Sequence, residues 1–356
     1  MRTLPRLLTR SLLTLPALTL TLSACGSGPP PEEEISDTPV WTTSATGKRT
    51  CPQYSEIDNA LFDVTPSEVT MRDAATGNTR WTQKQENASC PLVTKEAVYV
   101  TIKGKLLALD RGTGKEKAAL EMPMSESRVP PVATPSGVHA GFSGDILTAD
   151  IQLQRELWKH EETSDMWIDE TEASNDTLVM ATHNGKVKAL SGKDGHLIWT
   201  YTTPTYGEID ATMSVDDGLV YFASGDGSLY AVDVTTGKEA WDTKLNEIDA
   251  WTPNLTGSML ITGGGEYLHG LDKKTGQNIW KRKIFPQVFI AAADQVIYAT
   301  EPSDGKTWVT SLNAATGAVN WKFSSSSKIF SLAISSSHFF VWTETEIKAY
   351  ELTTPK

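Results

Sequence analysis

The amino-acid sequence predicts an all-β fold, an eight-bladed β-propeller of four-stranded antiparallel blades. Three observations predict it. A short motif recurs about every 40 residues, a tryptophan closes almost every copy, and the two chain ends complement each other. A fixed period of this length, built from strand signals, is typical of an array of four-stranded blades. No apolar period of 3.6 residues runs through any repeat, which argues against helical repeats.

The clearest copy of the motif is LYAVDVTTGKEAW, residues 229–241. Its first five residues have the period of two that is typical of a half-buried strand. Gly237 permits the positive φ that a short hairpin with a bulge requires. Trp241 then offers a large apolar surface to the core. Because one such hairpin is not stable alone in water, a larger array is expected.

The other copies place a large side chain at the same closing position. They are residues 69–81, 106–118, 146–158, 187–199, 268–280 and 309–321. The closing positions lie 37 to 42 residues apart, and only Ala118 is not a tryptophan. The spacing therefore predicts one blade for each copy.

The chain ends predict how the array closes. The last copy, residues 346–354, stops after one strand and has neither the glycine nor the tryptophan. Trp41 lies 40 residues before Trp81, so residues 39–44 supply the missing strand in register. We expect them to complete the blade begun by residues 322–354, which brings the count to eight blades and removes exposed sheet edges. The propeller domain is thus residues 39–356.

The repeat Ala-x-Asp-x-x-Thr-Gly-x-x-x-Trp resembles that of pyrroloquinoline-quinone (PQQ)-like β-propellers, the quinoprotein alcohol dehydrogenase-like superfamily. The resemblance covers nearly the whole chain after residue 38. A lipidated protein of this length most resembles the BamB-like scaffold lipoproteins of barrel assembly and other PQQ-like repeat lipoproteins. The resemblance is specific for the fold and much less so for the function, because one fold hosts many activities.

Residues 1–24 are predicted to be a lipoprotein signal peptide. Three arginines precede an apolar run that is too short to span a bilayer. The run ends in Leu22-Ser23-Ala24-Cys25, which resembles the bacterial lipobox, and this implies cleavage before Cys25 and acylation of its thiol, for example with palmitate. Two or three acyl chains would anchor the protein stably. The alternative is an ordinary secretory signal with a chance cysteine. Residues 25–38, which are polar, acidic and rich in proline, are predicted to be a flexible tether. The alternative is that Glu32 to Glu34 form a specific docking segment.

The charge of the chain limits its partners. Formal net charge is −12, and removal of the signal peptide with its three arginines leaves 29 basic and 44 acidic residues, or −15. Such a charge argues against nucleic acid or anionic lipid as the bound surface. It permits a basic protein segment or a cationic ligand. We predict a monomeric propeller in the cell envelope, lipid-anchored on the extracytoplasmic side of the bacterial membrane, with an envelope or secreted protein as partner.

Two cysteines remain once Cys25 is acylated. Cys51 follows Trp41 by ten residues and Cys90 follows Trp81 by nine, so both fall near the innermost strands of adjacent blades. An even number of thiols outside the cytoplasm favours a disulfide. A pair of buried free thiols is the alternative, and either arrangement is structural.

The same inner position is acidic in three successive blades. The acids are Asp169, Asp210 and Asp249, and the aromatic residues beside them are Trp167, Tyr206 and Trp251. Phe289 and Phe330 take the corresponding place on the opposite side, which makes that side apolar. We expect the acidic sector to bind a basic or amphipathic partner. The alternative is that these acids are solvated residues that line the channel.

Catalysis is not expected. The resemblance implies that PQQ-dependent dehydrogenases stack their quinone on a vicinal cysteine pair beside calcium, and this chain has no such pair. The six histidines are scattered, and no calcium-loop, nucleophile-elbow or phosphate-loop motif occurs. We therefore predict no cofactor, no metal and a non-catalytic scaffold. A small-ligand sensor is the alternative, and a PQQ-dependent dehydrogenase is the less favoured one.

Overall fold

The computed structural model describes residues 33–34, 38–45, 51–122, 129–142, 145–161, 168–182, 185–204, 213–245, 253–264, 266–283, 289–292, 295–300 and 306–352. The predicted signal peptide and Cys25 lie outside these residues. Within the described ranges, no helix has the length and apolar character needed to cross a membrane.

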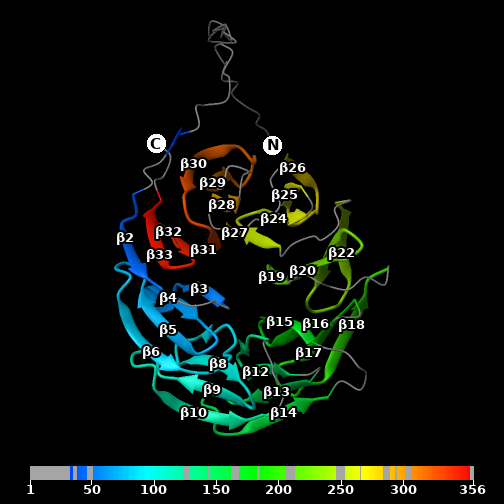
Figure 1. The fold of residues 1–356 in the computed structure, drawn as a ribbon. Coiled ribbons are helices and arrows are strands. Elements are labelled where there is room, and N and C mark those ends of the chain that lie inside the picture. Colours follow the sequence, from blue (N-terminus) through cyan, green and yellow to red (C-terminus); the bar gives the residue numbers. More distant parts are fainter. Residues whose placement is uncertain are drawn as a thin grey trace, which may run out of the picture. The chain divides into compact units, whose positions relative to one another are not determined.

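The described strands form eight sheets, numbered here as blades in chain order (Figure 1). Blade 1 contains β3 (Cys51–Ser55), β4 (Ala60–Val64), β5 (Glu68–Asp73) and β6 (Thr79–Lys84), and blade 2 contains β7 (Leu92–Val93), β8 (Val98–Ile102), β9 (Lys105–Leu109) and β10 (Glu116–Glu121). Blade 3 contains β11 (Val132–Thr134), β12 (Gly137–Phe142), β13 (Asp145–Ala149) and β14 (Glu156–His160), and blade 4 contains β15 (Ile168–Ser174), β16 (Thr177–Thr182), β17 (Lys186–Ser191) and β18 (Leu197–Thr202). A short 3-10 helix, η1 (Ile57–Asn59), joins β3 to β4.

Blade 5 contains β19 (Ser214–Asp216), β20 (Leu219–Ser224), β21 (Ser228–Asp233) and β22 (Glu239–Lys244), and blade 6 contains β23 (Asn254–Thr256), β24 (Met259–Gly264), β25 (Tyr267–Asp272) and β26 (Asn278–Lys283). Blade 7 contains β27 (Phe289–Ala292), β28 (Gln295–Thr300), β29 (Thr307–Asn313), β30 (Val319–Ser325) and β1 (Glu33–Glu34). Blade 8 contains β31 (Ile329–Ile334), β32 (His338–Thr343), β33 (Glu346–Glu351) and β2 (Trp41–Ser44). The innermost strands of the eight blades are β3, β7, β11, β15, β19, β23, β27 and β31 (Figure 1). The strand that carries the tryptophan column, or Ala118 in blade 2, lies at the outer side of each blade, and in blade 7 β1 lies outside it.

The two ends of the propeller meet in blade 8, as the sequence predicts. β2 pairs with β33 in antiparallel register, with Trp41 opposite Ala349. The backbone amide of Val40 also donates to the carbonyl of Ala349 at 2.7 Å. Residues far apart in the sequence therefore share one sheet (Figure 1).

Blade 7 corrects the predicted fold class. Seven sheets are four-stranded and antiparallel, but blade 7 has a fifth strand, β1, which pairs with β30 in parallel. The prediction that all eight blades are four-stranded and antiparallel is therefore wrong. β1 pairs with β30 because the unpaired backbone groups at a sheet edge can form hydrogen bonds with another extended segment. The polar composition of residues 25–38 favoured a solvated tether over a docking segment at Glu32 to Glu34, because their side chains have little to bury.

The hydrophobic core is divided among the contacts between neighbouring blades. The described residues form eight clusters of buried side chains, and each combines side chains of two consecutive blades. One of them closes the ring, since Trp342 and Ile347 of blade 8 pack with Leu61 and Ala74 of blade 1. Alternate residues of a strand face opposite sides of its sheet, so each blade contributes to two of these clusters.

The tryptophan column holds six blades to the turn of the next. In six cases the indole Nε1 donates to a backbone carbonyl of the following blade, with Trp199 donating to Val234 at 2.7 Å as one example. The turn glycine lies against the ring. A Cβ on Gly237 would be 2.6 Å from Trp199, and Gly237 has a φ of +67°. The glycine of the repeat is therefore needed for both its conformation and its lack of a side chain.

The aspartate of the repeat builds the same turn. In blade 5 the Oδ1 of Asp233 accepts from the amides of Thr235 and Thr236 and from the hydroxyl of Thr236, at 2.7 to 3.0 Å. These bonds, above all the one from the Thr236 hydroxyl, hold the pKa of Asp233 below its usual range. The motif D-x-x-T-G is thus structural, which accounts for its recurrence on the outer rim.

Candidate functional site

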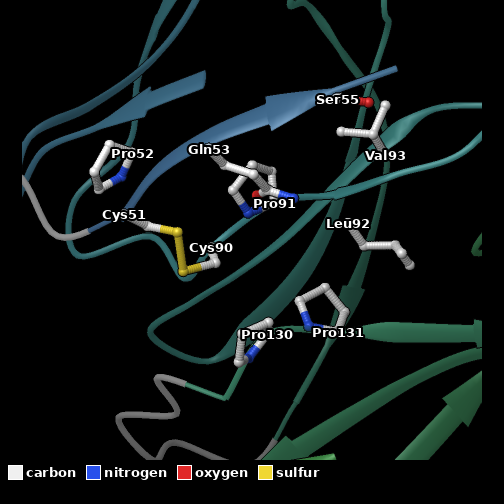
Figure 2. A pocket seen from close by; sticks show the side chains of 10 residues that line it. All are labelled: Cys51, Pro52, Gln53, Ser55, Cys90, Pro91, Leu92, Val93, Pro130 and Pro131. Atoms are coloured by element: carbon white, nitrogen blue, oxygen red, sulfur yellow. A yellow bond between two sulfur atoms is a disulfide. The ribbon is translucent and has the colours of Figure 1, made fainter. Parts of the chain in front are cut away.

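A pocket of about 380 Å³ opens between the inner edges of blades 1, 2 and 3 (Figure 2). Its walls come from β3, from the segment that leads into β7, and from the residues just before β11. The lining residues are Cys51, Pro52, Gln53, Ser55, Cys90, Pro91, Leu92, Val93, Pro130 and Pro131. The pocket therefore combines residues of three blades.

A disulfide between Cys51 and Cys90 forms one side of this pocket. The two Cα atoms are 5.4 Å apart, within the range of about 4.4–6.8 Å usual for disulfides. This is the pairing expected from the sequence. Figure 2 shows the bond linking the first residue of β3 to the segment before β7. Since β7 has only two residues, the covalent link strengthens the junction of blades 1 and 2 where strand contact is short.

The rest of the pocket is mainly apolar and rigid. Four prolines face it together with Leu92 and Val93 (Figure 2). Proline has a fixed φ and no N–H, so these walls offer shape and apolar surface but few backbone donors. Such a surface suits an apolar or aromatic group of a ligand or partner.

The predicted acidic sector is described only in part. Asp169 lies on β15, the inner strand of blade 4, but its side chain is outside the described residues. Asp210, Asp249, Trp167, Tyr206 and Trp251 lie outside the described residues as well. Phe330, on the inner strand β31, has 42% of its side chain exposed, which agrees with an apolar opposite side.

Two further acids on β15 were missed by the sequence analysis. The carboxylate of Glu170 accepts a hydrogen bond from the backbone amide of Met213, which precedes the inner strand of blade 5. Burial raises the pKa of Glu172 to about 7. Both lie on the same face of β15 as alternate residues of the run Glu-Thr-Glu. That run was the available signal, but it was not distinguished from ordinary solvent-facing acids.

Polar side chains also connect the inner edges of successive blades. The hydroxyl of Thr171 donates to the carbonyl of Pro130 at 3.4 Å, and that of Ser214 donates to Pro253 at 2.5 Å. With Glu170, they join blades 3 to 6 through side-chain to backbone bonds. The inner rim is thus held in place before any partner binds, which lowers the entropy cost of association.

The donor set does not fit a quinone and calcium centre of the kind that the resemblance implies. Cys51 and Cys90 are 39 residues apart and belong to two blades, so they form no vicinal pair on which a quinone could stack. Within the described ranges, no three His, Cys, Asp or Glu side chains lie together as a metal site.

The sequence was compared with protein families and known proteins. The family model described as outer membrane protein assembly factor BamB matches residues 34–165, 143–287 and 226–347. The chain is similar to tetrathionate hydrolase of Acidithiobacillus ferrooxidans, with 31% identity over 156 residues, which cover 38% of this chain and 30% of that protein. It is also similar to serine/threonine-protein kinase AfsK of Streptomyces coelicolor, with 24% identity over 232 residues, 63% of this chain and 26% of the kinase. The chain thus spans less than a third of either relative.

A solved structure shows the same fold. The crystal structure of BamB from Moraxella catarrhalis superposes with a TM-score of 0.70 and covers 89% of this chain and 99% of its own. The sequence identity is 18%, so this likeness establishes the propeller architecture alone.

Proposed function

The chain belongs to the family of outer membrane protein assembly factor BamB, and from this premise we propose that it is a non-catalytic scaffold of the cell envelope. The scaffold binds a protein partner at the inner rim of its propeller. The observation that carries the proposal is the rim itself, where an apolar pocket on blades 1 to 3 meets a strand rich in acids on blade 4.

The chemistry of the rim fits a basic or amphipathic protein segment. Proline, leucine and valine side chains provide an apolar surface on which an apolar side chain of the partner can pack. Asp169 and Glu170 belong to β15, and the net charge of the chain is −12. Complementary charge mainly raises the association rate, whereas apolar and aromatic contacts supply most of the affinity.

Membrane anchoring through Cys25 is part of the proposal. It rests on the lipobox-like run before Cys25. Changing Cys25 to Ser is expected to move the protein from the detergent phase to the aqueous phase in a phase-partition assay. Equal partitioning of the two forms would remove the lipoprotein proposal.

The partner site is tested by chemical crosslinking in intact cells followed by mass spectrometry. Crosslinks are expected at the inner rim of blades 1 to 6. The variant D169N/D210N/D249N should associate more slowly and show a weaker dependence on salt than the parent. Its matched control is E86Q/E116Q/E121Q, which changes three exposed glutamates away from the inner strands. The control and the acidic-sector variant therefore have the same net charge. Normal binding by the acidic-sector variant, with crosslinks on another face, would refute the proposed site.

A second candidate is a sensor for a small ligand, favoured by the pocket volume of about 380 Å³. This lies near the lower end of the range of about 300–1,000 Å³ for ligand pockets. A thermal-shift screen of small cationic and aromatic compounds, with PQQ included, separates the candidates. A ligand that raises the melting temperature in the parent and loses its effect in Leu92→Asp would favour the sensor.

A further inference from the structure

The outer edge of blade 7 is the place where the structure departs from the repeat. β1 pairs with β30 in parallel, with Glu33 opposite Trp321 and Glu34 opposite Lys322. None of the other seven sheets carries an added strand among the described residues. An unpaired edge strand is a ready acceptor for an extended segment.

The accessibility of β30 also differs from that of its counterparts. The outer strands β6, β10, β18, β22 and β26 each begin with two exposed residues. β30 has no exposed residue along its seven positions. Its outer surface is therefore covered, which agrees with a docked segment on that edge.

The indole of Trp321 also distinguishes blade 7. In six blades the tryptophan donates to the turn of the following blade, but the described part of blade 8 ends at Leu352, before such a turn. Trp321 is nevertheless only 3% exposed, and its Nε1 has no hydrogen-bond partner among the described residues. β1 passes at the register of Trp321.

The local charge suits an acidic segment. The mature chain is strongly acidic, yet β30 contributes Lys322 directly opposite Glu34. The neighbouring outer strand β26 ends in Lys281, Arg282 and Lys283, and Arg282 donates to the carbonyl of Gly317 in the turn before β30 at 3.3 Å. A basic region of this kind attracts carboxylates, and salt weakens the attraction at an exposed site.

We infer that the outer edge of β30 is a strand-docking site whose occupant is the chain's own acidic segment at Glu33–Glu34, and that this docking holds blade 7 close to the lipid anchor. The second half of the inference rests on the proposed acylation of Cys25. The site fits an extended acidic strand in parallel register, with main-chain pairing and charge both contributing.

Chain length determines what docking does. Eight residues separate Cys25 from Glu33, which span at most about 26–29 Å when fully extended. Without docking, the first fixed position is Trp41 in β2, 16 residues from Cys25, and the reach rises to about 53–58 Å. Docking therefore halves the distance that the propeller can move from the membrane and selects the blade that faces it.

The first test measures docking without any dependence on lipidation. Hydrogen exchange is followed in the full chain, purified in detergent, at the outward-facing amides near Trp321 and Lys322. The variant E33K/E34K is expected to exchange there at least tenfold faster than the parent, while E116K/E121K, with the same change of charge on another outer strand, leaves the rate unchanged. Equal exchange in the parent and E33K/E34K overturns the inference.

The second test measures position at the membrane. The protein is bound to vesicles that contain a lipid-linked energy acceptor, and a donor dye is placed at Ala315→Cys in blade 7 or at Gln152→Cys in blade 3, four blades away around the ring. Both positions are exposed. Energy transfer from blade 7 is expected to be about twofold higher than from blade 3, and E33K/E34K should remove the difference.

The outcomes separate this inference from the proposed function. Equal transfer from the two blades in the parent overturns the membrane-facing role of blade 7. Failure of the parent to bind vesicles refutes the lipid anchor, and the exchange test then still decides whether β30 is a docking site.

Discussion

Replacement of Trp41 by alanine tests how the ring is closed. Trp41 belongs to a segment that looks like linker in the sequence, but it pairs with Ala349 through β2 and packs on Gly77 of blade 1. Its Nε1 donates to the carbonyl of Ala74 at 3.1 Å. One side chain therefore connects the first blade to the last, and its removal should weaken the whole domain.

The magnitude follows from the burial of the ring. Trp41 is half-buried, whereas Trp81, at the corresponding place between blades 1 and 2, is 6% exposed. Loss of the apolar contact costs about 2 kcal/mol and loss of the hydrogen bond about 1 kcal/mol. We expect Trp41→Ala to lower the free energy of unfolding by about 3 kcal/mol and the melting temperature by about 6 °C. Trp81→Ala should cost more, about 3–5 kcal/mol.

Differential scanning calorimetry and urea unfolding of the purified full chain provide the measurement. Val40→Ala is the matched control, because Val40 is 55% exposed and its backbone bond to Ala349 survives the change. This control should melt with the parent. If Trp41→Ala melts within about 1 °C of the parent while Trp81→Ala is strongly destabilised, then β2 does not close the ring and the reasoning fails.

Three further predictions concern the disulfide, a turn glycine and a buried histidine. Replacing Cys51 and Cys90 together by serine should lower the free energy of unfolding by about 2–4 kcal/mol, and an unchanged urea midpoint would contradict the structural role of the bond. Gly237→Ala should cost clearly more than Gly218→Ala, since both have positive φ but only Gly237 has a neighbouring ring within 4 Å; equal melting temperatures would show that the ring contact is unimportant. Burial lowers the pKa of His139 to about 4 from 6.5, so its stabilising effect is complete above pH 6.5 and declines as the pH falls toward 4. His139→Gln should flatten the loss of stability across this window, and urea midpoints that fall equally in both proteins would refute the assignment.

Much of the fold could be predicted because the same turn and tryptophan contact recur in most repeats. The aspartate, threonine, glycine and tryptophan of the motif make the contacts seen around Asp233, Gly237 and Trp199. A period set by such contacts fixes blade boundaries and the register of the chain ends. The pairing of Cys51 with Cys90 followed from the same register.

Features outside the repeat could not be predicted in the same way. β1 depends on backbone groups of β30, and backbone pairing leaves no mark in the side chains of Glu33 and Glu34. The role of Glu170 depends on where the amide of Met213 lies in the next blade. The pocket of blades 1 to 3 depends on loop prolines whose positions do not repeat. A periodic signal reports what all blades share, whereas binding sites arise where the blades differ.

The single gap in the tryptophan column shows how two departures from the repeat can explain each other. Ala118 replaces the tryptophan of blade 2. The turn that it should meet in blade 3 has Gln154 at the position where the other complete copies of the motif carry glycine, directly after Leu153. Leu153 has a φ of +55°, which is unfavourable for a residue with a side chain, yet it is only 3% exposed and packs in the cluster that includes Ala118. The leucine side chain thus occupies space that an indole fills at the other junctions, and its burial offsets the backbone strain. Either exception alone would leave a cavity or a clash, but together they preserve the packed junction. At the junction of blades 2 and 3 the column therefore acts as a constraint on a pair of positions in consecutive blades, and both positions depart from the motif together.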